Sequence, residues 1–238
     1  MPLPFFYKED IDLTTSDVLL DEAASKHIVQ VLRMQNGGQL QLTNGKGNLF
    51  TAEISDDNRK KCAVKIIQTS KIGNPKSKIC IAISLLKNPT RFEWFLEKVT
   101  EIGVTEIIPL ICQRTEKTNF KMERMKSILV SAMLQSQQCW LPVLHEPDKY
   151  ANVQMSKWAN TEKYIAHCED ENNKQPLTNK LINQSTNKLI LIGPEGDFTK
   201  QEIELALQNN FLPVTLGETR LRTETAGVVA ATILKFSN

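Results

Sequence analysis

The charged residues best suited to chemistry lie in one short segment near the C-terminus. Residues 217–227 (GETRLRTETAG) hold two arginines, two glutamates and three threonines. They join an expected strand at 212–217 to an apolar run at 227–234, which has almost no polar face and must be buried. Charges at the edge of a core are usually paired or functional, so Arg222 and Glu224 are candidate catalytic residues. The alternatives are an exposed, well-capped helix start and a purely structural ion pair.

A second candidate segment is IGPEGDF at 192–198, which follows another expected strand. Its glycines permit close backbone approach to a ligand, and Pro194 stiffens the turn. The helix expected after Thr199 presents free N–H groups at its start. Ligands of parallel α/β sheets bind at such strand ends. A tight strand-to-helix turn without a ligand would need similar residues, so the motif by itself leaves both readings open.

Hydrophobic patterning predicts the elements that must position these segments. Beyond a linker near 71–76, strands at 79–86, 104–111, 163–168, 188–193 and 212–217 alternate with helices. Most of these strands are apolar on both faces, as in a mainly parallel sheet covered by helices. Thr90 with Glu93 and Thr199 with Glu202 fit capping boxes. Before the linker, short alternating strands around the turn at 44–47 predict a small β-rich, barrel-like domain with one helix at 23–32. We therefore expect domains at 1–72 and 73–238.

Composition bounds the function further. The chain has 238 residues and a formal net charge of +2, which excludes a generally polycationic binder. Seven basic residues and no acidic one lie between 59 and 78, either as a nucleic-acid surface or as a solvated face. No stretch reaches the roughly 20 apolar residues of a membrane helix, so we expect a cytoplasmic protein.

The cysteines and histidines do not suggest a metal site. The five cysteines are odd in number and scattered, without C-x-x-C spacing, so we expect neither disulfides nor structural zinc. The three histidines are too scattered for a metal site. All cysteines except Cys139 lie in apolar runs where a small buried thiol is expected.

These motifs together resemble the RsmE family of 16S ribosomal RNA uridine methyltransferases, which belong to the SPOUT superfamily. The likeness covers nearly the whole chain, including His27-x-x-x-Val31-Leu32-Arg33, the turn Asn44-Gly45-Lys46-Gly47, and Lys98-x-Thr100-Glu101-Ile102-Gly103-Val104. The family's I-G-P-E-G-G is matched except at Asp197. Its L-G-x-R-I-L-R-x-E-T-A is matched except that Thr219 and Arg220 stand where arginine and isoleucine are usual.

The resemblance implies an α/β fold with a trefoil-knotted, mainly parallel sheet, preceded by a small PUA-like β-barrel. Composition and periodicity alone would favour an open doubly wound sheet, because knots are rare. The family uses S-adenosylmethionine, methylates uracil N3 and works as a homodimer whose active site the partner completes. The implied donor pocket is formed by Ile192, Gly193, Pro194, Glu195, Gly196, Leu216, Gly217, Leu221 and Thr225.

Methyl transfer to uracil N3 needs a group that handles the N3 proton or stabilises the uracil anion. Arg222 is the first candidate for stabilising the anion, with Glu224 either orienting it or acting as base, and Glu195 as the alternative base. We expect 16S ribosomal RNA or the small ribosomal subunit to contact Arg33, Lys46, Lys60, Lys61, Lys87 and Arg91.

Two other functions compete with this assignment. The first is a catalytically inactive RNA-binding module that docks on the small ribosomal subunit. The second is a small-molecule enzyme that uses GPEG as a phosphate cradle; the chain disfavours it, because no lysine follows in P-loop spacing and no G-x-G-x-x-G is present.

Overall fold

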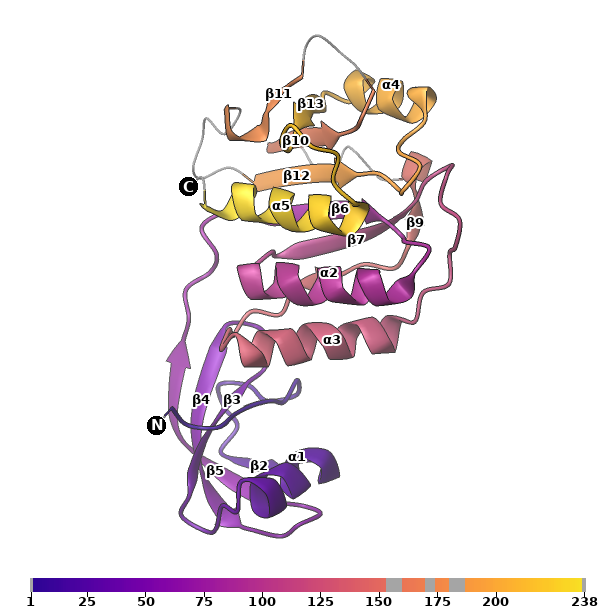
Figure 1. The fold of residues 1–238 in the computed structure, drawn as a ribbon. Helices are drawn as coiled ribbons and strands as arrows, with labels where there is room; N and C mark the ends of the chain where they lie inside the picture. The colour runs from indigo at the N-terminus through magenta and orange to yellow at the C-terminus, as the bar shows by residue number, and fades with distance from the viewer. Residues whose placement is uncertain (1, 153–159, 170–173, 180–186, 237–238) are drawn as a thin grey trace. The chain divides into compact units, whose positions relative to one another are not determined.

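The computed structural model describes residues 2–152, 160–169, 174–179 and 187–236. It forms two compact units (Figure 1). The first unit contains Met1–Asn74 together with Met133–Leu141, and the second contains Pro75–Ala132 and Pro142–Asn238. Among the described residues, no helix is long and apolar enough to cross a membrane.

The first unit is built on a curled sheet with the strand order β1-β3-β4-β5-β2. The strands are β1 (Phe5–Tyr7), β2 (Asp17–Leu19), β3 (Gln39–Thr43), β4 (Asn48–Asp56) and β5 (Ala63–Lys71). The hairpin of β3 and β4 is antiparallel, as the turn at 44–47 predicts. Alternate residues of these two strands, such as Leu40, Leu42 and Phe50, are buried in one core, which accounts for the alternating pattern of the sequence.

The helix of the first unit is shorter than the sequence predicts. Helix α1 covers only Glu22–Lys26, with Asp21 as its N-cap, and a π-helical turn, η1 (His27–Val31), follows it. The expected single α-helix over 23–32 is therefore wrong in its second half. The chain then leaves the turn through Arg33, whose φ is 54°.

A segment distant in sequence completes the β3–β4 turn. The backbone N–H of Gly47 donates to the carbonyl of Cys139 (2.8 Å), and that of Leu141 donates to the carbonyl of Gly45 (2.9 Å). Between them, the indole Nε1 of Trp140 donates to the carbonyl of Gly73 (3.2 Å). A Cβ atom on Gly47 would lie 2.2 Å from the Trp140 ring. The turn therefore depends on glycine at 47 for space as well as for its φ of 79°.

The second unit contains a sheet with the strand order β11-β13-β10-β12-β6-β7-β8, and β9 also pairs with β7. Every strand pair in this described sheet is parallel. This confirms the predicted mainly parallel sheet. Its strands are β6 (Ile79–Ser84), β7 (Glu106–Ile111), β8 (Val143–Leu144), β9 (Asp148–Lys149), β10 (Thr161–Ala166), β11 (Gln175–Pro176), β12 (Asn187–Ile192) and β13 (Leu212–Thr215).

Helices cover both faces of this sheet. Cys80 and Ala82 of β6 share a buried cluster with Ile203 of α4 (Lys200–Gln208). On the other face, α5 (Thr223–Phe236) packs on β6 and on α2 (Pro89–Ile102). A Cβ on Gly227 of α5 would lie 2.5 Å from the Phe95 ring of α2, so the two helices approach closely there. Helix α3 (Met122–Gln135) and the 3₁₀ turns η2 (Tyr150–Asn152) and η4 (Leu177–Asn179) complete the described helices.

The helix caps agree with the sequence at α4 but not at α2. Thr199 and Glu202 form the predicted capping box. Helix α2 begins earlier than Thr90, because extended Asn88 is the N-cap and Pro89 takes the first helical position; the Asn88 side chain accepts from the Thr90 N–H (3.0 Å). Gly103 ends the helix in the left-handed conformation.

The close approach of Trp140 predicts a specific cost for a methyl group at position 47. Gly47→Ala should lower the free energy of unfolding by about 3 kcal/mol, from backbone strain plus overpacking. Gly37 is the matched control, since its φ is also positive (83°) and nothing lies within 4 Å of an added Cβ. Gly37→Ala should cost about 1 kcal/mol. Urea denaturation followed by circular dichroism measures both, and equal losses would contradict the role of Trp140.

Candidate active site

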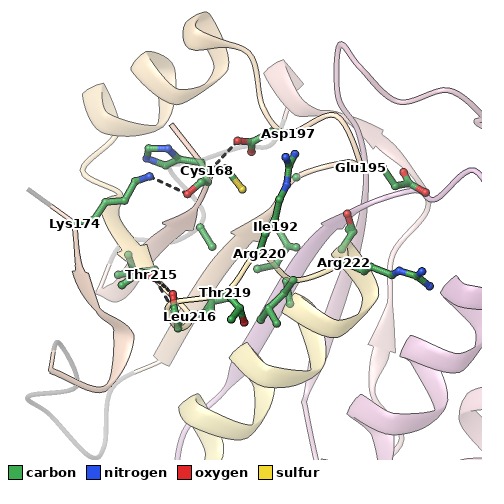
Figure 2. Close-up of a pocket in the computed structure, with 18 of the residues that line it drawn as sticks. Cys168, Lys174, Ile192, Glu195, Asp197, Thr215, Leu216, Thr219, Arg220 and Arg222 are labelled. Atoms are coloured by element: carbon green, nitrogen blue, oxygen red, sulfur yellow. Dashed lines mark hydrogen bonds between the residues drawn. The ribbon is translucent and has the colours of Figure 1, made fainter. Parts of the chain in front are cut away.

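A pocket of about 750 Å³ lies at the carboxyl ends of three neighbouring strands, β10, β12 and β13. Figure 2 shows residues from the three following loops and from the start of α5 converging on it. Ala166 at the end of β10 and the following residues His167 and Cys168 line the pocket, and Lys174 lies opposite the start of α5. The remaining wall is formed by residues 192–195, Asp197, residues 214–223 and Ala226. This is the strand edge at which parallel α/β sheets bind ligands.

Most of the residues predicted to hold a donor meet in this pocket. They are Ile192, Gly193, Pro194, Glu195, Leu216, Gly217 and Leu221. Gly196 and Thr225 are not among the lining residues. Gly196 instead faces Arg114, whose Nη1 donates to the Gly196 carbonyl (2.7 Å).

The loop after β12 is fixed from both sides. The backbone N–H of Lys87 donates to Oε1 of Glu195 (3.2 Å). Asp197 accepts the backbone N–H of Cys168 on Oδ2 (2.7 Å) and that of Phe198 on Oδ1 (2.8 Å). Its φ of 64° is in the left-handed region, which aspartate tolerates better than most residues. Asp197 therefore ties the loop after β12 to the end of β10 with a side chain that a glycine there would lack.

The loop after β13 turns at Gly217, whose φ is 147°. The Thr215 hydroxyl stabilises this turn by donating to the carbonyl of Gly217 (2.7 Å) and accepting from its N–H (3.3 Å). An added side chain at 217, a position that lines the pocket, would meet no neighbour within 4 Å of its Cβ but would be strained by the backbone conformation.

The two arginines of this loop have different surroundings. Arg220 extends from the loop toward the end of the pocket where Asp197 and Cys168 lie, whereas Arg222 points away from Lys174 (Figure 2). The carbonyl of Arg222 accepts the N–H of Ala226 (2.7 Å), so Arg222 occupies the N-cap position of α5. An arginine side chain has no acceptor for the free N–H groups of a helix start, and its charge opposes the helix dipole. This position is not the well-capped helix start that a structural explanation would require.

Glu224 contacts Arg91 instead of Arg222. Its side chain is 8% exposed, and its Oε1 lies 3.6 Å from Nε of Arg91 in α2. Its Oε2 is buried and has no hydrogen-bond partner among the described residues. Among the residues that the structure describes, no hydrogen bond or ion pair joins Glu224 to Arg222. The geometry therefore links Glu224 to Arg91, a residue that the sequence analysis expected at RNA.

The other predicted RNA-binding residues are divided between the two units. In the second unit, Lys87 Nζ forms an exposed ion pair with Glu116 (2.7 Å). Arg33, Lys46, Lys60 and Lys61 belong to the first unit and are exposed at its surface.

Sequence reasoning missed the wall of the pocket that follows β10. Strand β10 lies between β12 and β13, so its carboxyl end is flanked by both predicted loops. A strand was predicted at 163–168, but its place in the sheet cannot be read from periodicity. Lys174 is held there by the carbonyls of His167 (2.9 Å) and Glu169.

The expected burial of Cys168 is wrong, and Cys139, which the expectation left out, is buried. Cys168 is instead exposed in the pocket wall. The reason is that β10 ends at Ala166, so Cys168 lies in the loop beyond the covered strand. Although the residue is exposed, partial burial of its thiol raises the pKa of Cys168. The charge of Asp197 raises that pKa further, whereas the charge of Arg220 lowers it.

Comparisons with known proteins agree with this architecture. Residues 73–235 match the family described as RNA methyltransferase domain, and residues 20–67 match the RNA methyltransferase PUA domain. The chain is 30% identical over 217 residues to a ribosomal RNA small subunit methyltransferase E of Rickettsia conorii, with 88% of this chain and 86% of the relative covered. The corresponding Synechocystis protein is 31% identical, with 90% and 71% covered.

Solved structures have the same fold. A probable rRNA-methyltransferase from Porphyromonas gingivalis is 40% identical with a TM-score of 0.88, covering 98% of both chains. A ribosomal RNA small subunit methyltransferase E from Neisseria gonorrhoeae, bound to S-adenosyl methionine, is 28% identical with a TM-score of 0.84, covering 96% of this chain and 95% of that one.

The fold and the pocket therefore define an RNA methyltransferase with an N-terminal PUA domain. The predicted fold class, a SPOUT α/β domain preceded by a PUA-like β domain, is confirmed. Within that class, the chain belongs to the family of ribosomal RNA small subunit methyltransferase E.

The exposure of Cys168 predicts selective thiol chemistry. A disulfide reagent such as dithiobis-nitrobenzoate should react rapidly with one thiol per chain, because the other four cysteines are buried. Burial raises the pKa of Cys112 to about 12, which slows that thiol further. Since the pKa of Cys168 also lies above its ordinary value of 9.0, the fast rate should rise about tenfold per pH unit from 7 to 9. Absorbance stopped-flow measures this rate, and a fast phase that persists in Cys168→Ser would contradict the assignment.

Proposed function

We propose that this protein transfers the methyl group of S-adenosylmethionine to N3 of a specific uridine in 16S ribosomal RNA. The observation that carries the proposal is the pocket at the ends of β10, β12 and β13, in a chain of the ribosomal RNA small subunit methyltransferase E family. A volume of about 750 Å³ suits a ligand of this size.

The pocket residues fit the donor by type as well as by volume. Apolar side chains of Ile192, Val214, Leu216 and Leu221 provide surfaces for a purine ring. The turn at Gly217 keeps backbone groups accessible to its polar edge. A sulfonium donor supplies an already activated methyl group, so the protein needs mainly to position two substrates and manage one proton.

Arg222 is the residue we assign to the uracil anion. Its guanidinium would stabilise the negative charge that develops as the N3 proton leaves, an effect that is largest in a preorganised site. Its place at the N-cap of α5 supports this role, because the position is unfavourable for the helix itself. Glu224, held near Arg91, is one candidate base. Glu195 is the other, and its carboxylate also accepts the Lys87 N–H.

RNA binding is assigned to both units. The exposed basic residues of the PUA unit would contact backbone phosphates, as would Lys87 and Arg91, which contact Glu195 and Glu224 in the second unit. The target uridine must leave its stack to reach the methyl group. The trefoil knot, the homodimer and the cytoplasmic location implied by the family resemblance and the ribosomal substrate stay predictions of this proposal.

A catalytically inactive docking module is the alternative function. A formed donor pocket with glycine turns and a free arginine would serve no purpose in such a module. Titration of the purified protein with S-adenosylmethionine separates the two, because only the enzyme needs donor affinity.

Mapping of methylated uridines tests the proposed reaction directly. Mass spectrometry of 16S ribosomal RNA from cells with and without this protein should show one uridine that loses its N3 methyl group in its absence. Re-expression of Gly217→Val should fail to restore the mark, because a branched side chain is strained at a φ of 147° and would distort a turn that lines the donor pocket. Gly73→Val, at an open site without positive φ, is the control that should restore it. An unchanged map in cells without the protein would refute the activity.

The N-cap position of Arg222 predicts opposite effects on stability and turnover. Arg222→Ser supplies the missing cap acceptor and should raise the free energy of unfolding by about 0.5–1 kcal/mol. The same change should lower turnover by roughly a hundredfold or more, with donor affinity nearly intact, because the stabilised charge exists only as the reaction proceeds. Denaturation, donor titration and single-turnover kinetics measure the three quantities. A stabilised variant with unchanged turnover would remove Arg222 from the mechanism.

A further inference from the structure

Two side chains of opposite charge, Asp197 and Arg220, lie in one wall of the pocket. Both line the pocket, and both act on the thiol of Cys168, where their charges have opposite effects. A negative and a positive side chain therefore lie in the same part of the site.

The two charged side chains differ in their contacts with the rest of the protein. Each carboxylate oxygen of Asp197 accepts one backbone N–H, which fixes its position and leaves further lone pairs available. Arg220 forms no ion pair with any described residue, and its side chain is exposed in the pocket. The other cations are not equivalent, since Lys174 donates to backbone carbonyls and Arg222 points to the other side (Figure 2).

We infer that Arg220 binds the α-carboxylate of the methyl donor's amino-acid end. This inference rests on the proposed function, because it names a contact of the donor within the same site. A planar guanidinium can donate two parallel hydrogen bonds to a carboxylate. The donor also carries a sulfonium and an ammonium, so an unpaired arginine would oppose its binding unless the carboxylate lies beside that arginine.

Asp197 favours the donor's carboxylate over an RNA phosphate as the partner of Arg220. The amino-acid end brings an ammonium together with its carboxylate, so that both wall charges find an opposite charge. A phosphodiester brings negative charge alone and would be repelled by Asp197. The arrangement of one fixed carboxylate and one free guanidinium therefore matches a zwitterion.

Calorimetric titration with two donors tests the contact. The probes are S-adenosylmethionine and its decarboxylated analogue, which keeps the sulfonium and the amine. The proteins are the wild type, Arg220→Met, which keeps an apolar stem, and Arg124→Met, which removes a positive charge from the same unit outside the pocket. Binding to the 16S ribosomal RNA is measured for the same three proteins.

We expect the wild type to prefer the carboxylated donor by about tenfold or more, the usual size of a charged hydrogen-bonded contact. Arg220→Met should abolish this preference and bind the decarboxylated donor at least as tightly as the wild type, which also shows that its pocket is folded. Arg124→Met should keep the wild-type ratio. An unchanged ratio in Arg220→Met overturns the inference, and a loss confined to RNA affinity assigns Arg220 to a phosphate instead. A wild type that binds neither donor would refute the proposed function itself.

Discussion

The site depends on the parallel pairing of β10 between β12 and β13. Each pair is in register over several residues, so the three strands end at the same edge. Parallel strands need long crossovers, and here the crossovers bring together loops that are distant in sequence. The backbone N–H of Cys168 reaches Asp197 only because β10 and β12 end side by side. The pocket is thus a consequence of strand order.

Hydrogen bonds to backbone groups then hold the loops at that edge. Arg114 donates to the Gly196 carbonyl, the Glu195 carboxylate accepts the Lys87 N–H, and Asp197 accepts two N–H groups. Each bond satisfies a main-chain group that a turn leaves without a partner in the sheet. These contacts leave the side chains of Arg220 and Arg222 without a hydrogen bond or ion pair to another described residue, and both arginines line the pocket. The proposed stabilisation of the uracil anion would require such a fixed environment.

The sequence allowed the strands, the glycine turns and most of the donor loops to be predicted, because each has a local signature. Ile192, Gly193 and Gly217 follow apolar strands directly, and the chemistry of a turn is visible within a few residues. The wall formed by His167, Cys168 and Lys174 had no such signature, since its position comes from the strand order. The contact of Trp140 with Gly47 joins segments nearly 100 residues apart, and the pairing of Glu224 with Arg91 is set by the packing of α5 on α2. Periodicity carries no information on such long-range contacts.

Local conformational rules are broken several times around this one pocket. Arg222 occupies an N-cap without an acceptor, Asp197 adopts a left-handed conformation, and Glu224 buries a carboxylate oxygen without a hydrogen bond. Each feature is unfavourable by itself. Other residues would suit these positions better. Serine at 222 would cap the helix, glycine at 197 would adopt the left-handed conformation without strain, and glutamine at 224 would remove the buried charge. Natural sequences keep such violations mainly where function requires them. Their concentration at the strand ends, with a fully buried β6 beneath, supports the proposal that this pocket binds the reactants.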